Sequence, residues 1–297
     1  MRVKLTDGEN RLLALHYLFP VPKNRLNALY EIDPNLEKLH TYSVERLAFL
    51  LRIKIEKAVY LKENFLKNLS TPYDLLYKQH GITPIPFTHS LYPKRLLELI
   101  DPPTILYSKG DASILAEKFK VAIIGSRKAT VYSKNAMSLI VPPLVANNTV
   151  IVSGLAKGAD AMAHKAAIFY GGKTIAVLGH GLFHLYPHEN KELANEIGEN
   201  HLLISEYPSY VKPERWTFPM RNRIISGLSD AVIVTESASK SGTMSTVEHA
   251  LDHGKHIFAV PGSVMSSLSE GPNQLIDEGA RPLWNGFQVV GSLFNQI

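Results

Sequence analysis

Six short apolar segments recur between residues 121 and 260, and each ends at small, polar or turn-forming residues. They read VAII, TVIV, TIAVL, LLIS, AVIV and HIFAV. Consecutive apolar positions rich in β-branched residues are typical of strands buried on both faces of a parallel sheet. Helical patterns such as DAMAHKAAIF and TMSTVEHALD lie between several of them. This alternation predicts an α/β fold, in which a Rossmann-like, doubly wound and mainly parallel sheet has helices on its faces.

The first 80 residues have a different pattern. Segments such as NRLLALHYL, SVERLAFLL and KIEKAVYLKENFLKNL place apolar residues three and four positions apart, which predicts short helices. We therefore expect a small helical domain over residues 1–80. A proline-rich connecting segment, residues 81–118, follows and joins the core, with a short strand around Thr104–Tyr107. Residues 119–297 form the predicted α/β domain.

Composition restricts the classes of function. The net charge of +5 over 297 residues favours an anionic partner. The chain has no cysteine, which excludes disulfides, thiolate metal sites and cysteine nucleophiles and fits a reducing compartment. No apolar run approaches the roughly 18 residues that span a bilayer, and the N-terminus lacks an apolar signal core. We expect a cytoplasmic protein that does not associate with membranes.

The segments that follow the predicted strands hold the candidate binding residues, because ligands of open parallel sheets bind outside the carboxyl ends of the strands. These segments read GSRKAT, SGLAKGAD, GHGLFHLYPHEN and ESASKSGTMST. Glycines allow backbone N–H groups to approach a ligand, helix N-termini add partial positive charge, and arginine binds phosphate with two hydrogen bonds. One such loop alone would indicate only a tight turn between strand and helix. Several loops with basic residues favour phosphate binding.

Basic and aromatic residues are interleaved in one further segment, RWTFPMRNR. Arg215, Arg221 and Arg223 surround Phe218, a pattern that suits single-stranded nucleic acid, whose bases stack while its phosphates pair with cations. A core phenylalanine beneath an exposed basic face is the alternative. Among the strand-end loops, Arg127 directly follows a Gly-Ser turn and is the leading candidate, whereas Lys157 is equally consistent with a solvated surface charge. Lys240 is the basic residue of the last loop.

Other segments resemble nucleotide-binding or metal-binding motifs but do not match their spacing. GGKT lacks the first glycine of a phosphate loop and precedes a strand, and GHG has His184 where a dinucleotide fingerprint needs its third glycine. We therefore expect no cofactor. His180, His184 and His188 are four residues apart, but Gly181 and Pro187 interrupt any helix that would align them. No metal site is predicted.

The order of the motifs resembles that of one known family. GSR, SGLAKGADAMAH, GLFHLYPHENKEL, ISEYP, FPMRNRIISGLSDAVIVTES, KSGT, FAVPG and EGPNQLIDEGA follow one another as in DNA-processing protein A, the DprA or Smf family. The resemblance covers about residues 80–285. It implies a Rossmann-like domain that binds single-stranded DNA and helps load the RecA recombinase during natural transformation. Members are generally dimers and mediators rather than enzymes, so we expect no catalytic activity. The N-terminal helices resemble, more loosely, the SAM-like domain of many members.

The resemblance also assigns roles to residues. Arg127 would be the main phosphate contact, and Ser126 with the loop Gly154–Asp160 would frame the same pocket. Arg215 and Phe218 match the base-contacting element that precedes RNR. The full set of expected DNA contacts is Ser126, Arg127, Gly154, Lys157, Gly158, Lys191, Arg215, Phe218, Arg221, Asn222, Arg223, Lys240, Ser241, Gly242 and Thr243.

Two alternatives remain open. SGTMSTVEHAL also resembles the G-G-x-G-T-x-x-E element of nucleotide phosphoribohydrolases, although Thr246 stands at the glutamate position and Glu248 lies two residues beyond it. The second alternative is an interaction scaffold whose pocket has lost its function.

Overall fold

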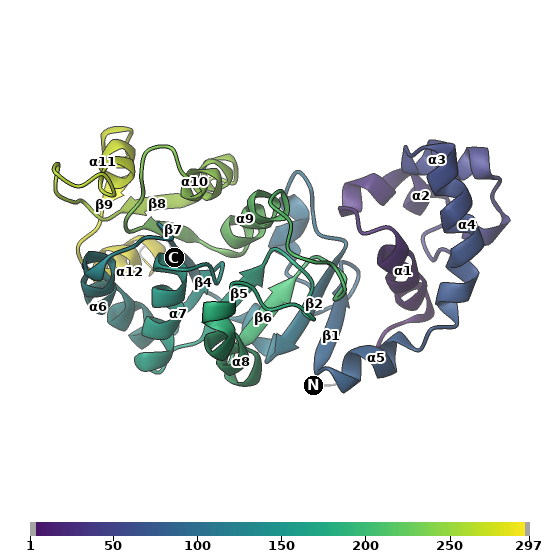
Figure 1. Ribbon diagram of the computed structural model, residues 1–297, viewed down its shortest axis with the longest axis horizontal. Coiled ribbons are helices and arrows are strands. Elements are labelled where there is room, and N and C mark those ends of the chain that lie inside the picture. Colours follow the sequence, from purple (N-terminus) through teal and green to yellow (C-terminus); the bar gives the residue numbers. More distant parts are fainter. Residues whose placement is uncertain (1–3, 295–297) are drawn as a thin grey trace.

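The N-terminal region is built from short helices that pack on one another. The computed structural model describes residues 4–294, apart from the side chains at positions 74 and 294. Thr6 and Glu9 form a capping box at the first helix, and the Ser43 side chain caps the third. Helices α1 and α3 both pack against α4, and Figure 1 shows the group beside the sheet. The helices are α1 (Asp7–Leu18), α2 (Asn27–Ile32), α3 (Val44–Leu51), α4 (Ile55–Leu69) and α5 (Tyr73–Gln79).

The remaining chain forms a nine-stranded sheet in the order β1-β2-β6-β5-β4-β3-β7-β8-β9. All six predicted strands are present as β3 to β8, and they pair in parallel. The predicted Rossmann-like sheet is therefore confirmed. The strands are β1 (Ile82–Pro86), β2 (Ile105–Gly110), β3 (Lys120–Ile124), β4 (Val150–Ser153), β5 (Thr174–Leu178), β6 (Leu202–Ser205), β7 (Ala231–Val234), β8 (His256–Ala259) and β9 (Arg281–Pro282).

Helices cover both faces of the sheet, as the apolar strands require. Val121 and Ile123 of β3 join one hydrophobic cluster with α6, α7 and α12, whereas Ala122 and Ile124 join another with α9, α10 and α11. Successive side chains of a strand point to opposite faces, so an unbroken apolar run needs a layer on each side. These helices are α6 (Val131–Ala146), α7 (Ala159–Phe169), α8 (Lys191–Asn200), α9 (Thr217–Leu228), α10 (Gly242–Asp252), α11 (Glu270–Asp277) and α12 (Gly286–Phe294).

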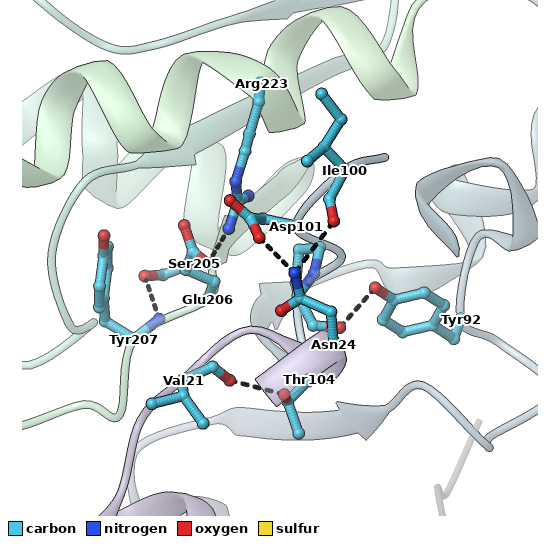
Figure 2. A network of polar contacts seen from close by, with 11 residues as sticks. Val21, Asn24, Tyr92, Ile100, Asp101, Thr104, Ser205, Glu206, Tyr207 and Arg223 are labelled. Atoms are coloured by element: carbon cyan, nitrogen blue, oxygen red, sulfur yellow. Dashed lines mark hydrogen bonds and ion pairs between the residues drawn. The ribbon is translucent and has the colours of Figure 1, made fainter. Parts of the chain in front are cut away.

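Residues 81–118 contribute two strands to the sheet. β1 pairs antiparallel with β2, and β2 pairs antiparallel with β6. The N-terminal helices share a hydrophobic cluster with β2 and α8, and the Tyr77 and Tyr107 rings lie 5.4 Å apart within it. Figure 2 shows the polar part of this junction, where the Asn24 side chain donates to Asp101 and the Thr104 hydroxyl donates to the Val21 carbonyl. The helical region is therefore joined to the sheet by both apolar and polar contacts.

Two buried histidines make stability depend on pH. Burial lowers the pKa of His16 to about 3 and that of His164 to about 3, against about 6.5 in an unfolded chain. As the pH falls below about 6.5, the unfolded chain binds protons that the folded chain does not. The free energy of unfolding then falls by ~1.4 kcal/mol per pH unit for each histidine, until the folded pKa is reached.

We predict that His16→Asn removes one of these two contributions. Urea denaturation between about pH 7 and pH 5 should show a decline in the free energy of unfolding that is on average ~1 kcal/mol per pH unit shallower than in the unmodified chain, because this range begins above the unfolded pKa. His40→Asn is the control, because His40 is exposed and its loss should leave the decline unchanged. An equal decline in all three proteins would contradict the prediction.

Candidate nucleic-acid interface

The polar loops named from the sequence lie at one edge of the sheet. Because β3 to β8 run parallel, the segments after these strands all leave from their carboxyl ends. β3 leads through α6 to β4 on one side, whereas β7 lies on its other side. The chain therefore departs in opposite directions from β3 and β7, which is the arrangement that opens a ligand-binding crevice in α/β sheets.

The turn after β3 is held tightly between its neighbours. A Cβ atom on Gly125 would lie 2.7 Å from Ala159 Cβ and 2.9 Å from the Glu236 carbonyl oxygen, so only glycine fits there. The Ser126 N–H donates to that same carbonyl, and the Ser126 carbonyl accepts from the Ala159 N–H. The loops that follow β3, β4 and β7 are thereby joined through main-chain hydrogen bonds.

Arg127 leaves this fixed turn toward solvent. Its side chain is exposed, and its guanidinium carbon lies 5.9 Å from the centre of the Phe218 ring. Within the described part of the chain this guanidinium has no carboxylate partner. A cation over a partly buried aromatic ring can bind a phosphate and leave the ring to a neighbouring base.

Glu236 is a buried acid that sequence reasoning missed. Its carboxylate accepts hydrogen bonds from the Thr130 N–H, the Thr130 hydroxyl and the Ser133 hydroxyl, and only 3% of the residue is exposed. These contacts attach the start of α6 to the end of β7. The sequence signal that could have indicated it is a carboxylate two residues after an apolar strand, together with the Thr130-x-x-Ser133 pattern at a helix start. With its oxygens occupied in this way, Glu236 holds the site together.

The loop after β4 depends on two glycines. Gly158 has a φ of +73°, and a Cβ there would lie 2.3 Å from the Ser126 carbonyl oxygen. A Cβ on Gly154 would lie 2.3 Å from the Arg221 guanidinium. Asp160 is buried beside them, and this burial raises the pKa of its carboxyl. Both glycines therefore shape the loop by allowing close approach.

Arg221, predicted from the sequence to contact DNA, lies inside the protein. Its guanidinium donates to the carbonyls of Gly154 and Val177, and its Nε–H donates to the Asn222 side chain. Burial lowers the pKa of Arg221 to about 10, so it remains charged at neutral pH. Asn222 is also buried, and its amide donates to the Ser245 hydroxyl at 2.8 Å. Neither side chain faces solvent.

Arg223, also predicted from the sequence to contact DNA, is likewise buried. It is 4% exposed and forms an ion pair with Glu206 at 2.5 Å. Figure 2 shows the pair in the network that includes Asp101 and Asn24. Burial raises the pKa of the Glu206 carboxyl, whereas the neighbouring Arg223 acts in the opposite direction. The ion pair therefore joins α9 to the loop that follows β6.

The other predicted residues are spread along the same edge. Ser241 precedes α10, its hydroxyl lies 2.6 Å from that of Ser237, and Gly242 faces open space. Lys157 is exposed and paired with Glu189, a surface pair of little energetic value. Asn190 donates to the carbonyls of Leu155 and Ala156, which brings the start of α8 against the loop after β4. The exposed side chains of the predicted set are Arg127, Lys157, Lys191, Arg215 and Lys240.

Comparison with known proteins identifies the family. Residues 83–293 match the family described as DNA recombination-mediator protein A. The chain belongs to this family. It is 42% identical over 217 residues to DNA processing protein DprA of Bacillus subtilis, covering 73% of each protein. It is 46% identical over 200 residues to DprA of Streptococcus pneumoniae, covering 67% of this chain and 70% of that protein.

Solved structures of DprA proteins have the same fold. The X-ray structure of DprA from Streptococcus pneumoniae gives a TM-score of 0.82 at 34% identity and covers 97% of this chain and 98% of its own. A structure of DprA from Helicobacter pylori, described as giving insight into a single-stranded DNA binding mode, gives a TM-score of 0.65 at 34% identity. It covers 72% of this chain and 96% of its own.

Over residues 4–294, no group of three histidine, aspartate or glutamate side chains could hold a metal ion. None of the helices described is both long enough and apolar enough to cross a membrane.

We predict that Gly158→Ala destabilises the protein more than Gly171→Ala. Both glycines have nearly the same positive φ, +73° and +74°, but a Cβ on Gly171 meets nothing within 4 Å. Gly171→Ala should lower the free energy of unfolding by about 1 kcal/mol through backbone strain alone. Gly158→Ala should lower it by about 2–4 kcal/mol, because the new Cβ also overlaps the Ser126 carbonyl. Urea denaturation measures both, and equal losses would contradict the proposed close approach.

Proposed function

We propose that this protein binds single-stranded DNA at the carboxyl edge of its sheet and acts as a recombination mediator. The observation that carries the proposal is Arg127, an exposed guanidinium held over the Phe218 ring just after β3, where the chain leaves β3 and β7 in opposite directions. A phosphate would pair with the guanidinium, and the adjacent unpaired base would stack on the ring. A duplex offers no unstacked base to such a ring, so single strands should bind more tightly.

The comparisons support this proposal in two ways. The family is described as recombination mediators, and the Helicobacter pylori relative is described by its single-stranded DNA binding mode. The sheet edge that carries Arg127 lies within the matched residues 83–293. The finer role we propose is that the protein helps load the RecA recombinase on single strands in the cytoplasm during natural transformation, and that it does so as a homodimer.

We also propose that the protein is a mediator without catalytic activity. Of the acids near the site, Glu236 and Asp160 are buried and hydrogen-bonded within the loops. Thr246, at the glutamate position of the phosphoribohydrolase element, is 2% exposed. These observations weigh against cleavage at a ribosyl carbon, which needs an acid at the bound nucleotide.

We predict that Arg127→Ala weakens binding to single-stranded DNA by about tenfold or more, because a charge-assisted hydrogen bond is lost. The slope of log affinity against log salt should also become shallower by about 0.7, the value for one phosphate contact on a single strand. Fluorescence anisotropy with an oligothymidylate over a series of salt concentrations measures both quantities.

Arg46→Ala is the matched control for that experiment. Arg46 is also exposed and also lies over an aromatic ring, 5.0 Å from the centre of Tyr42, but in the N-terminal helices. Its loss should change neither affinity nor salt slope. If Arg127→Ala and Arg46→Ala behave alike, Arg127 is not the phosphate contact.

For the finer role, we predict that the protein shortens the lag before RecA assembles on single strands already coated by a single-strand-binding protein. The Arg127→Ala variant should restore the lag because it cannot hold the strand. RecA-dependent ATP hydrolysis reports this assembly. Incubation of the unmodified protein with nucleoside monophosphates tests the enzymatic alternative, and base release that disappears in Glu248→Gln would overturn the proposed absence of catalysis.

A further inference from the structure

Exposed aromatic rings continue beyond Phe218 along the same edge of the molecule. Two loops carry them, one between β5 and α8 and the other between β6 and α9. Side chains of this size and apolarity are rarely left in water without a binding role when they occur together. The exposed rings in these two loops are Phe183 at 41%, Tyr186 at 46%, Tyr210 at 41% and Trp216 at 61%.

Ring contacts connect part of this set to the proposed DNA site. The Tyr186 ring lies 5.8 Å from the Phe218 ring, which in turn lies under the Arg127 guanidinium. Phe183 is three residues from Tyr186 in the same loop, and its ring lies 4.5 Å from that of His80, at the end of α5. Two pairs of rings, Tyr186 with Phe218 and Phe183 with His80, are therefore carried by one loop, the first pair at the sheet edge and the second at the N-terminal helices.

The backbone beneath these rings is fixed. The Phe183 N–H donates to the Ser209 carbonyl at 3.0 Å, and the Gly181 N–H donates to the Val211 carbonyl at 2.8 Å. The Tyr210 hydroxyl donates to the carbonyl of Tyr17 in α1, so the second loop is also attached to the helices. Figure 1 shows the loop before α9 extending from the sheet toward those helices. Rings on such loops are arranged before a ligand arrives, which lowers the entropic cost of binding.

The charge along the two loops is positive. Exposed cations of the two loops are Lys212 and Arg215, and Lys157 cancels the charge of Glu189 by pairing with it. Lys191 and Glu192, both exposed at the start of α8, offset each other. Glu214 is the remaining exposed acid of these loops. Aromatic faces interleaved with cations match a polyanion with exposed bases better than they match an apolar peptide or an acidic surface.

We propose that Tyr186, Phe183 and His80 form a second segment of the single-strand binding surface, which carries the DNA from the Arg127–Phe218 site to the N-terminal helices. This inference rests on the proposed function. It adds that the protein contacts a longer stretch of DNA than the sheet edge alone could bind. It also adds that the single-stranded DNA leaves the Arg127–Phe218 site toward the N-terminal helices. Binding by ring stacking would make this segment tolerant of sequence.

The test compares oligothymidylates of increasing length on the full chain carrying Tyr186→Leu and Phe183→Leu together. Leucine keeps apolar bulk but removes the ring faces. We expect affinity for the shortest oligonucleotide that still depends on Arg127 to be unchanged, and affinity for long oligonucleotides to fall about tenfold, the effect of losing one or two stacked bases. Tyr186→Phe retains the ring and should bind as the unmodified protein does.

Phe169→Leu is the matched control. Phe169 is 81% exposed at the end of α7, and because α7 begins at the carboxyl edge, its end lies toward the opposite edge of the sheet. This variant should bind every length normally. Oligonucleotides with 5-iodouracil at successive positions give a second readout, with photocrosslinks expected at residues 183 and 186 and at His80.

The outcomes separate the two proposals. If the unmodified protein binds no single strand, or Arg127→Ala binds normally, the proposed function fails. If binding depends on Arg127 but the double variant loses nothing on long strands, this inference alone is overturned. A double variant that binds DNA normally but sediments as a smaller species would instead identify the rings as a protein–protein contact, and would overturn it too.

Discussion

The exposed parts of the site depend on one buried cation. The Arg221 guanidinium donates to the carbonyls of Gly154 and Val177, at the ends of β4 and β5. A charge taken out of water is costly unless it is hydrogen-bonded or paired. Helix α9 is therefore held in the position where the Arg221 guanidinium can donate to these two carbonyls. Phe218 precedes Arg221 by one helical turn. The position of the ring under Arg127 therefore follows from the position of Arg221.

The sequence predicted the sheet well because an unbroken apolar segment by itself indicates a strand that is buried on both faces. It did not indicate that Arg221 and Arg223 are buried, although it found the segment that holds them. Spacing places a residue on a helix, but whether that face meets solvent depends on what else packs there. In α9, residues 221–228 are all buried, because the sheet, α10 and η3 (Lys94–Glu98) all pack against this helix. A Cβ on Gly227 would lie 2.9 Å from Leu99. The sequence of α9 itself does not indicate that these other elements pack against it.

Prolines explain a second difference between pattern and structure. The proline-rich segment 81–118 predicted a connection with one short strand, whereas it supplies both β1 and β2. Pro84 and Pro86 lie within β1, which pairs only with β2 and forms the edge of the sheet. A missing N–H is tolerated at an edge because one side of the strand has no partner. The prolines that predicted a connecting segment are thus compatible with an edge strand, at the side of the sheet where the helices pack.

The same edge strands give the N-terminal helices their place relative to the carboxyl edge. β2 joins β6, so the loop that leaves β6 starts beside the strand on which the helices pack. Tyr210 in that loop reaches Tyr17 of α1, and Phe183 in the neighbouring loop reaches His80. Any ligand that extends along these loops from Arg127 must therefore approach the helices. The contacts of these two loops therefore fix the helical region next to the carboxyl edge of the sheet.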